Sequence, residues 1–524
     1  MYARRLMGTG STGDADNPGA PGINVARIIE GHDGDAVALI SRNRAMTYGE
    51  LRDQVARARG GLADLGVADG TRVALLCGNG HPFVVAYLAA LGLGAVVVPL
   101  NPSSPASELV RELDVVHADV VVVDRSAAGT WRGIDRTTVG SVRHVVAVEG
   151  DAVADAMAWE TLVASDPVEV VDVAAGHLAV LMFTSGTAGA PRAAMLTHGN
   201  LLANLDQARS TIDRIGPEDV VYGVVPLFHI FGLNVVLGLS LAAGAAVLLV
   251  QRFDPATAIE SIRARNVTRV PGVPTMWAAF AHFDEAPADS FATVRTASSG
   301  AAKLPVAVAQ RVKERFGVSI AEGYGLTEAA PIVATSAGLT PRFGSVGKVL
   351  AGVELRVVDD DGSDVLVGDA GEIWVRGPNV FAGYLDDAEA SERVLTPDGW
   401  LRTGDIAVVD EEGWLYLVDR SKDLVIVSGF NVFPAEVEDV LAGHPDVAEV
   451  GVIGVPHPHT GEAVKAFVVL EPGATLDEDA LVDYARDHLA RYKCPSKVLF
   501  VDQLPRNASG KLLRRSLETD LLGA

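Results

Sequence analysis

The feature that most constrains the fold is a regular alternation of amphipathic helical stretches with short aliphatic runs in the first half of the chain. The runs VALLC, VVVPL, DVVVVD and VLLV occupy residues 73–77, 96–100, 119–124 and 247–250. Runs this short and apolar are typical of strands that are buried on both faces of a parallel sheet. The alternation resumes through 268–273 and 318–322. It predicts an α/β fold in which helices cover both faces of parallel sheets.

The pattern changes between residues 344 and 420, where short strands alternate with Asp-Gly and Glu-Gly turns at 361–362, 398–399 and 412–413. This pattern predicts a small β-barrel or sandwich. Beyond Asp423 we expect a compact α+β unit. Its expected helices span 434–442 and 478–489, and its expected strands span 448–454 and 463–470.

Composition and charge narrow the class of protein. The chain has 524 residues, 49% of them hydrophobic, so it is too long for a single core. Its formal net charge of -24 disfavours nucleic acid or an anionic bilayer as a partner, because both reward basic surfaces. The two cysteines, Cys77 and Cys494, provide no disulfide framework and fit a reducing compartment, so we expect a cytoplasmic protein. Residues 1–23 lack the apolar stretch of a signal peptide, and we predict a mobile tail.

Two uncharged runs, at 81–106 and 220–251, are each long enough to suggest a membrane helix. Gly92, Gly94 and Pro99 interrupt the first run, which becomes β-branched at 96–98. The second contains Pro226, His229 and Asn234. We therefore predict a buried helix, a turn and a buried strand in the first run, a buried α/β segment in the second, and no membrane span.

The segment 183–200, FTSGTAGAPRAAMLTHGN, follows an apolar run at 178–183 that predicts a buried strand. In it Thr184, Ser185 and Thr187 alternate with glycines. Glycines let backbone amides approach an anion closely, and hydroxyls add donors, so the loop suits phosphate oxygens. Arg192 adds a fixed positive charge. A polar connector between a strand and a helix is the alternative.

Four more segments follow in order: PLFHIFG at 226–232, EGYGLTE at 322–328, GWLRTGD at 399–405 with DRSKD at 419–423, and PRNASGK at 505–511. Together with the loop, they resemble the adenylate-forming superfamily of acyl-CoA synthetases, non-ribosomal adenylation domains and firefly-type luciferases. The resemblance runs from about Asn24 to the C-terminus. It implies a large N-terminal domain at 24–421, made of two doubly wound lobes and a β-barrel at about 342–421. A smaller, mobile α+β domain at 422–524 follows, with the hinge at Lys422.

Activating a carboxylate with ATP needs no general base, because the acid is already ionised at neutral pH. It needs orientation for in-line attack on the α-phosphorus and compensation of phosphoryl charge. The resemblance implies that Glu328 binds Mg²⁺, that Thr327 bonds the α-phosphate, and that Tyr324 stacks on adenine. Lys511 would bridge the carboxylate and the α-phosphate. Moving that lysine in and out would let one site run two half-reactions.

The remaining site residues are also implied by the resemblance. His229 would border the acyl pocket and position the substrate rather than transfer a proton. The catalytic set is Lys511, Glu328, Thr327, His229 and Arg192. The ATP or AMP site comprises Thr184, Ser185, Gly186, Thr187, Gly300, Ala301, Glu322, Gly323, Tyr324, Thr327, Asp405 and Arg420. The acyl pocket comprises His229, Phe231, Leu233, Val235, Ser299 and Gly325, and the CoA site comprises Ser428, Gly429 and Phe430.

One departure concerns Arg192-Ala193, where members of this superfamily usually carry Lys-Gly. Arginine keeps the charge and can grip phosphate with two hydrogen bonds, so we expect adenylation to persist.

Residues near the motifs indicate which branch of the superfamily the chain resembles. The aspartate with which amino-acid activators hold the substrate ammonium is missing beside PLFHIFG, which disfavours an amino-acid substrate. The stretch 344–376 lacks the insertion that ligases loading a carrier protein often have, which favours CoA as acceptor. We predict an AMP-forming acyl-CoA ligase that uses ATP, Mg²⁺ and CoA on an apolar monocarboxylic acid, first a medium or long fatty acid. The alternatives are an aryl or cinnamate-type acid and a ligase that loads a carrier protein. More remote are a luciferase-like oxygenase and a non-catalytic binding protein, and a homodimer stays open.

Overall fold

The computed structural model describes residues 22–519 with short gaps at 42–43, 150–152, 154, 185–191, 211–213, 360, 421–424, 428–429, 458–459, 490 and 508–509. The chain divides into two compact units. The first runs to Arg342 and includes Gly347–Glu354 and Val375–Leu401, and the second holds Phe343–Val346, Leu355–Trp374 and the chain from Arg402 onward.

A seven-stranded sheet forms one lobe of the first unit, in the order β7-β6-β5-β3-β4-β8-β9. Its strands are β3 (Arg72–Leu76), β4 (Val96–Pro99), β5 (Val120–Val123), β6 (His144–Ala147), β7 (Met157–Ala158), β8 (Leu178–Thr184) and β9 (Arg192–Thr197). Neighbours run parallel except β8 and β9. Every residue of β5 is buried, which explains its unbroken valine run.

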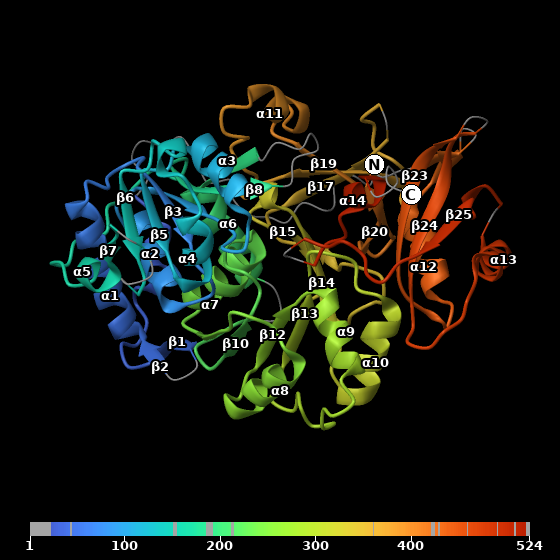
Figure 1. Cartoon of the computed structure of the whole chain (residues 1–524), viewed down its shortest axis with the longest axis horizontal. Coiled ribbons are helices and arrows are strands. Elements are labelled where there is room, and N and C mark those ends of the chain that lie inside the picture. The colour runs from blue at the N-terminus through green and yellow to red at the C-terminus, as the bar shows by residue number, and fades with distance from the viewer. Residues whose placement is uncertain are drawn as a thin grey trace. The chain divides into compact units, whose positions relative to one another are not determined.

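Helices accompany this sheet (Figure 1). They are α1 (Tyr48–Asp64), α2 (His81–Gly92), α3 (Ala106–Val116), α4 (Arg125–Arg132) and α5 (Trp159–Leu162), and α6 (His198–Arg209) follows β9. The predicted alternation of helices with buried parallel strands is confirmed in this lobe.

A nine-stranded sheet forms the second lobe, in the order β16-β15-β14-β13-β12-β10-β11-β1-β2. Its strands are β1 (Val37–Ser41), β2 (Arg44–Thr47), β10 (Val220–Gly223), β11 (Ala246–Leu249), β12 (Arg269–Gly272), β13 (Thr296–Ser299), β14 (Ile320–Gly325), β15 (Ile332–Thr335) and β16 (Lys348–Val349). The central strands run parallel, so the carboxyl ends of β10, β12, β13 and β14 share one edge. Ligands of open α/β sheets bind outside this edge.

The two uncharged runs fold as predicted. The first contains α2, a turn and β4, and the second contains β10, a π-helix at Phe231–Gly238, α7 (Leu239–Ala242) and β11. Helices α8 (Pro255–Ala264), α9 (Pro274–His282) and α10 (Val306–Phe316) lie beside β12, β13 and β14 in Figure 1. No described helix has both the length and the hydropathy that crossing a lipid bilayer requires.

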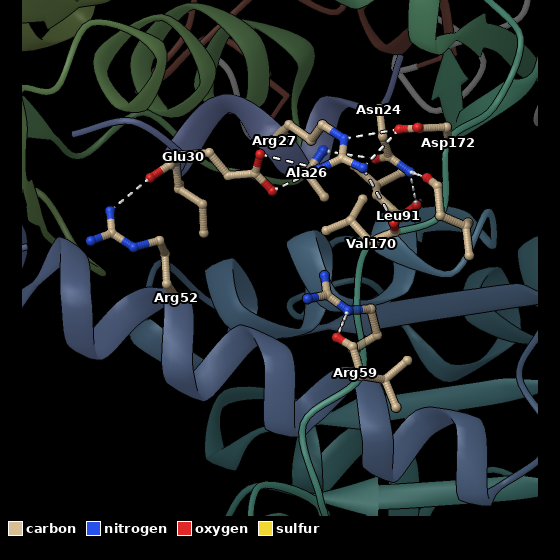
Figure 2. Close-up of polar contacts among 12 residues, drawn as sticks. Asn24, Ala26, Arg27, Glu30, Arg52, Arg59, Leu91, Val170 and Asp172 are labelled. Atoms are coloured by element: carbon tan, nitrogen blue, oxygen red, sulfur yellow. Dashed lines mark hydrogen bonds and ion pairs between the residues drawn. The ribbon is translucent and has the colours of Figure 1, made fainter. Parts of the chain in front are cut away.

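Polar contacts fix the first described segment of the chain (Figure 2). Ile23 pairs with Val173, and η1 (Val25–Ile29) follows. The Asn24 amide donates to the carbonyl oxygens of Leu91 and Val171 at 2.8 and 2.9 Å. Arg27 pairs with Asp172 at 2.8 Å. This segment is therefore tied to α2 and to the connector that leads into β8.

Two further sheets lie largely in the second unit. In the order β17-β18-β19-β20, four strands occupy the region of the predicted barrel: Glu354–Val358, Ala370–Arg376, Leu401–Val409 and Leu415–Arg420. The other sheet runs β22-β21-β24-β23, with β25 on β24: Phe430–Val432, Val425–Val427, Gly461–Leu470, Val447–His457 and Lys497–Phe500. Helices α12 (Pro434–Ala442) and α13 (Glu478–His488) confirm the two predicted helices, and α14 spans Arg514–Thr519. The predicted hinge, Lys422, lies outside the described residues.

Candidate active site

The candidate phosphate loop lies between β8 and β9, whose facing ends pair Thr184 with Arg192 in antiparallel register. Its residues Ser185, Gly186 and Thr187 lie outside the described residues. The loop is followed by a strand, β9, rather than by a helix. This strand pairs with β8 at the edge of the sheet, and its residues Ala193, Ala194 and Leu196 are buried. The run RAAMLT is short and does not alternate, so the sequence did not indicate this strand.

Arg192 is held in place at the end of this loop. Its Nε donates to Asp387 Oδ2 at 2.9 Å, and its guanidinium carbon lies 5.9 Å from the centre of the Tyr384 ring. Asp387 also caps α11 (Ala388–Val394) by accepting from the amide of Ala390. The Ala390 hydrogen bond, together with Arg192, holds the pKa of Asp387 below its usual range. The cation is therefore anchored to a carboxylate that stays charged.

Glu328, the candidate magnesium ligand, lies on η5 (Thr327–Ala329), just beyond β14. Its Oε1 accepts a 2.7 Å hydrogen bond from the hydroxyl of Tyr384, and its carbonyl oxygen accepts from the amide of Phe381 at 2.9 Å. Among the residues that the structure describes, Glu328 forms no ion pair with a basic side chain. Mg²⁺ is commonly held by one or two carboxylates together with substrate phosphates, so this carboxylate fits that role.

Glu322 lies in β14, and its side chain holds the loop that follows β13. Its carboxyl group accepts from the amide of Leu304 at 3.3 Å, and burial raises its pKa to about 7. Ser299, paired with Glu322 across β13 and β14, is 3% exposed, and its hydroxyl has no hydrogen-bond partner among the described residues. A Cβ placed on Gly300 would lie 3.4 Å from a ring carbon of Phe231. The structure therefore brings the Ser299–Gly300 turn against the PLFHIFG segment.

Within PLFHIFG, Nδ1 of His229 accepts from the amide of Phe231 at 3.2 Å. In the neutral ring the proton is then on Nε2, which agrees with a positioning role rather than that of a base at Nδ1. Phe231 and Val235 are half-buried and lie four residues apart, whereas Leu233 is fully buried. A Cβ on Gly232 would lie 2.0 Å from the Pro226 carbonyl oxygen, so only glycine allows this close helix approach.

Asn79 positions the same segment, a role that no sequence pattern indicates. From the loop between β3 and α2, its amide donates to the carbonyl oxygens of Gly223 and Val225 at 3.0 Å. Its Oδ1 accepts from the amide of Leu227 at 2.9 Å. A lone asparagine after a strand is ordinarily a turn residue, so only the fold reveals that it joins the two lobes.

The other candidates lie in the second unit. Asp405 is 6% exposed on β19 and pairs with Arg420 of β20 through the backbone. The backbone N–H of Lys511 donates to Asn507 Oδ1 at 2.8 Å. Ser428 and Gly429 lie outside the described residues, and Arg420 and Phe430 are described by their backbones alone.

Comparison with known proteins gives the class. The model of the AMP-binding enzyme family matches residues 26–385, and the model of its C-terminal domain matches 436–511. A Mycobacterium tuberculosis ligase, 3-[(3aS,4S,7aS)-7a-methyl-1,5-dioxo-octahydro-1H-inden-4-yl]propanoyl:CoA ligase, is 38% identical over 92% of this chain and 95% of its own. Feruloyl-CoA synthase from Amycolatopsis is 39% identical over 91% and 94%. ATP-bound MatB from Rhodopseudomonas palustris shares 32% identity with a TM-score of 0.87, covering 95% of this chain and 99% of its own.

The fold and the candidate site thus define a nucleotide-dependent α/β enzyme. The chain belongs to the AMP-binding enzyme family. The predicted adenylate-forming superfamily, the α/β fold class and the AMP-forming ligase are confirmed. The use of ATP, Mg²⁺ and CoA is confirmed at the level of this family.

Proposed function

We propose that this protein is an ATP-dependent acyl-CoA ligase for an apolar monocarboxylic acid. A carboxylate oxygen attacks the α-phosphorus of ATP and displaces pyrophosphate, which gives an acyl-adenylate. The thiol of CoA then attacks the acyl carbon and releases AMP. Magnesium, when bound, offsets the charge of the phosphates, and Glu328 would hold it. Lys511 would serve the first step, and Gly429 would let the pantetheine arm of CoA pass.

One observation carries the proposal: a charged half and an apolar half of the site meet at the carboxyl edge of the nine-stranded sheet. Glu328 follows β14. The Tyr384 hydroxyl donates to Glu328, and the Tyr384 ring contacts the Arg192 guanidinium. Phe231 packs on Gly300, which follows the neighbouring strand β13. The charged half suits the phosphates of ATP, and the apolar half suits the body of the acid.

The substrate we propose is a medium or long fatty acid. Long-chain-fatty-acid–CoA ligase from Salmonella typhimurium is 35% identical over 93% of this chain. Phe231 and Val235 of the proposed pocket are apolar and half-buried, so they would extend along an alkyl chain. The second candidate is a ring-bearing acid, because the feruloyl-CoA synthase is 39% identical.

Both cysteines are free thiols, which supports our proposal of a cytoplasmic location.

A panel of acids tests the substrate. The purified full chain is given ATP, Mg²⁺ and CoA with acetate, octanoate, palmitate, benzoate or coumarate, and the thioester is measured. Each buried methylene should add about 0.8 kcal/mol, or roughly fourfold in kcat/KM, until the pocket ends. A preference for acetate contradicts the proposed substrate. Adenylate formation without any thioester would instead support a ligase that loads a carrier protein.

A further inference from the structure

We propose that Tyr384 is a positioning residue that sets the Glu328 carboxylate for magnesium and supports the Arg192 guanidinium through its ring. The inference rests on the proposed function, because it assigns Glu328 to the metal that accompanies ATP. It adds to that function a residue outside the recognised motifs, one that couples the metal ligand to the cation of the phosphate loop.

Backbone hydrogen bonds fix the segment that carries Tyr384. The amide of Ala382 donates to the carbonyl of Met195, and the amide of Met195 donates to Gly383, both at 2.9 Å. The amide of Leu385 donates to Ala193 at 2.9 Å. Tyr384 is therefore held directly beside β9, the strand that begins with Arg192.

Each part of the side chain has a defined contact. The hydroxyl donates to Glu328 Oε1 at 2.7 Å. The ring lies edge-on to Phe381, with centroids 5.0 Å apart, and Arg192 lies at 5.9 Å from its centre. Asp387 holds Arg192 from another direction at 2.9 Å. The Tyr384 side chain thus contacts both the Glu328 carboxylate and the Arg192 guanidinium.

The phenol suits this task because it stays a donor. A tyrosine hydroxyl keeps its proton at neutral pH, so it can donate to the Glu328 carboxylate. A neutral donor fixes the orientation of Glu328 without neutralising its charge, and it occupies only one of the carboxylate's acceptor positions. Residues that orient metal ligands in this way typically contribute 10- to 100-fold to metal affinity or activity.

The test measures equilibrium binding of ATP by calorimetry on the full-length protein, with Mg²⁺ and separately with EDTA. In wild type, Mg²⁺ should tighten ATP binding. In Tyr384→Phe, which keeps the ring but removes the hydroxyl, this gain should fall about 10-fold, whereas binding in EDTA stays unchanged. Tyr416→Phe is the matched control, since it also removes a tyrosine hydroxyl that lies near a carboxylate, that of Asp410 at 3.5 Å.

Asp387→Asn perturbs the Arg192 side of the site and leaves the Tyr384–Glu328 hydrogen bond in place. Asparagine can still cap α11. It removes the charged partner that holds Arg192, so ATP should bind less tightly both with Mg²⁺ and in EDTA. Equal Mg²⁺ gains in Tyr384→Phe and wild type overturn the inference and leave the proposed function intact. If Tyr384→Phe weakens ATP binding as much in EDTA as with Mg²⁺, the inference is also overturned, because the hydroxyl would then be structural. Failure of wild type to bind ATP overturns both.

Discussion

At the scale of single residues, Glu112 shows how a buried carboxyl group lowers the stability of the folded state when it is ionised. It lies on α3 and is 7% exposed, and one of its carboxyl oxygens has no hydrogen-bond partner among the described residues. Burial, with a smaller contribution from Glu108, raises its pKa to about 7. In the unfolded chain the pKa would be about 4.5. The folded protein therefore binds the proton more tightly than the unfolded chain.

This difference predicts the effect of Glu112→Gln. Between pH 4.5 and 7 the native state of wild type binds more protons than the unfolded state, so its stability falls as the pH rises. Glutamine lacks this dependence, and at pH 8 the variant should gain on the order of 3 kcal/mol relative to its effect at pH 4. Urea unfolding at both pH values measures the change. The exposed neighbour Asp114→Asn is the control, and an unchanged pH slope in Glu112→Gln would contradict the account.

Lys511 is the residue on which the proposed first half-reaction depends. Lys511→Ala should slow adenylation by a factor on the order of 10²–10³, because it removes charge that stabilises the transition state. Thioester formation from supplied acyl-adenylate should stay near wild type. Lys497→Ala, which removes an exposed lysine paired with Glu478 in the same unit, is the control. Equal losses in both half-reactions would show that Lys511 is structural.

At the scale of elements, the strand-to-helix segment after β10 is fixed by a side chain from the other lobe. Asn79→Ala removes three hydrogen bonds to this segment and leaves buried carbonyl and amide groups unpaired. We expect KM for the acid to rise about 10-fold while the Kd for ATP changes little, since one or two such groups cost about 1–3 kcal/mol each.

Asn24→Ala provides the matched control for Asn79. Asn24 is also buried and donates to the carbonyl oxygens of Leu91, in α2, and of Val171, in the connector before β8. It should lower the melting temperature to a similar extent with no change in KM for the acid. A parallel rise in KM in both variants would mean that Asn79 acts only through stability.

The elements also show which information the sequence carries. Buried strands such as β5 and capped or proline-started helices such as α12 could be predicted, because local composition reflects burial. Strand β9 could not, because its pairing depends on β8 beyond the loop. The motif residues Arg192 and Glu328 could be proposed from the sequence. Tyr384, which contacts both, was not, because that contact exists only after distant segments meet.

At the scale of the whole molecule, the charge and the family agree on small-molecule chemistry. A net charge of -24 offers no general attraction for nucleic acid, and the solved relative MatB matches 95% of the chain. The first unit carries Arg192 and Glu328, and the second carries Asp405 and Lys511. In the proposed reaction, a carboxylate oxygen of the acid becomes bonded to the α-phosphorus of ATP.

An oxygen-transfer measurement tests this claim most directly. A fatty acid labelled with ¹⁸O in both carboxyl oxygens is converted by the full chain with ATP, Mg²⁺ and CoA, and the nucleotide product is analysed by mass spectrometry. We expect AMP that carries one ¹⁸O, because the bridging oxygen stays on phosphorus when CoA attacks the acyl carbon. ADP with labelled phosphate, or AMP without label, would contradict it.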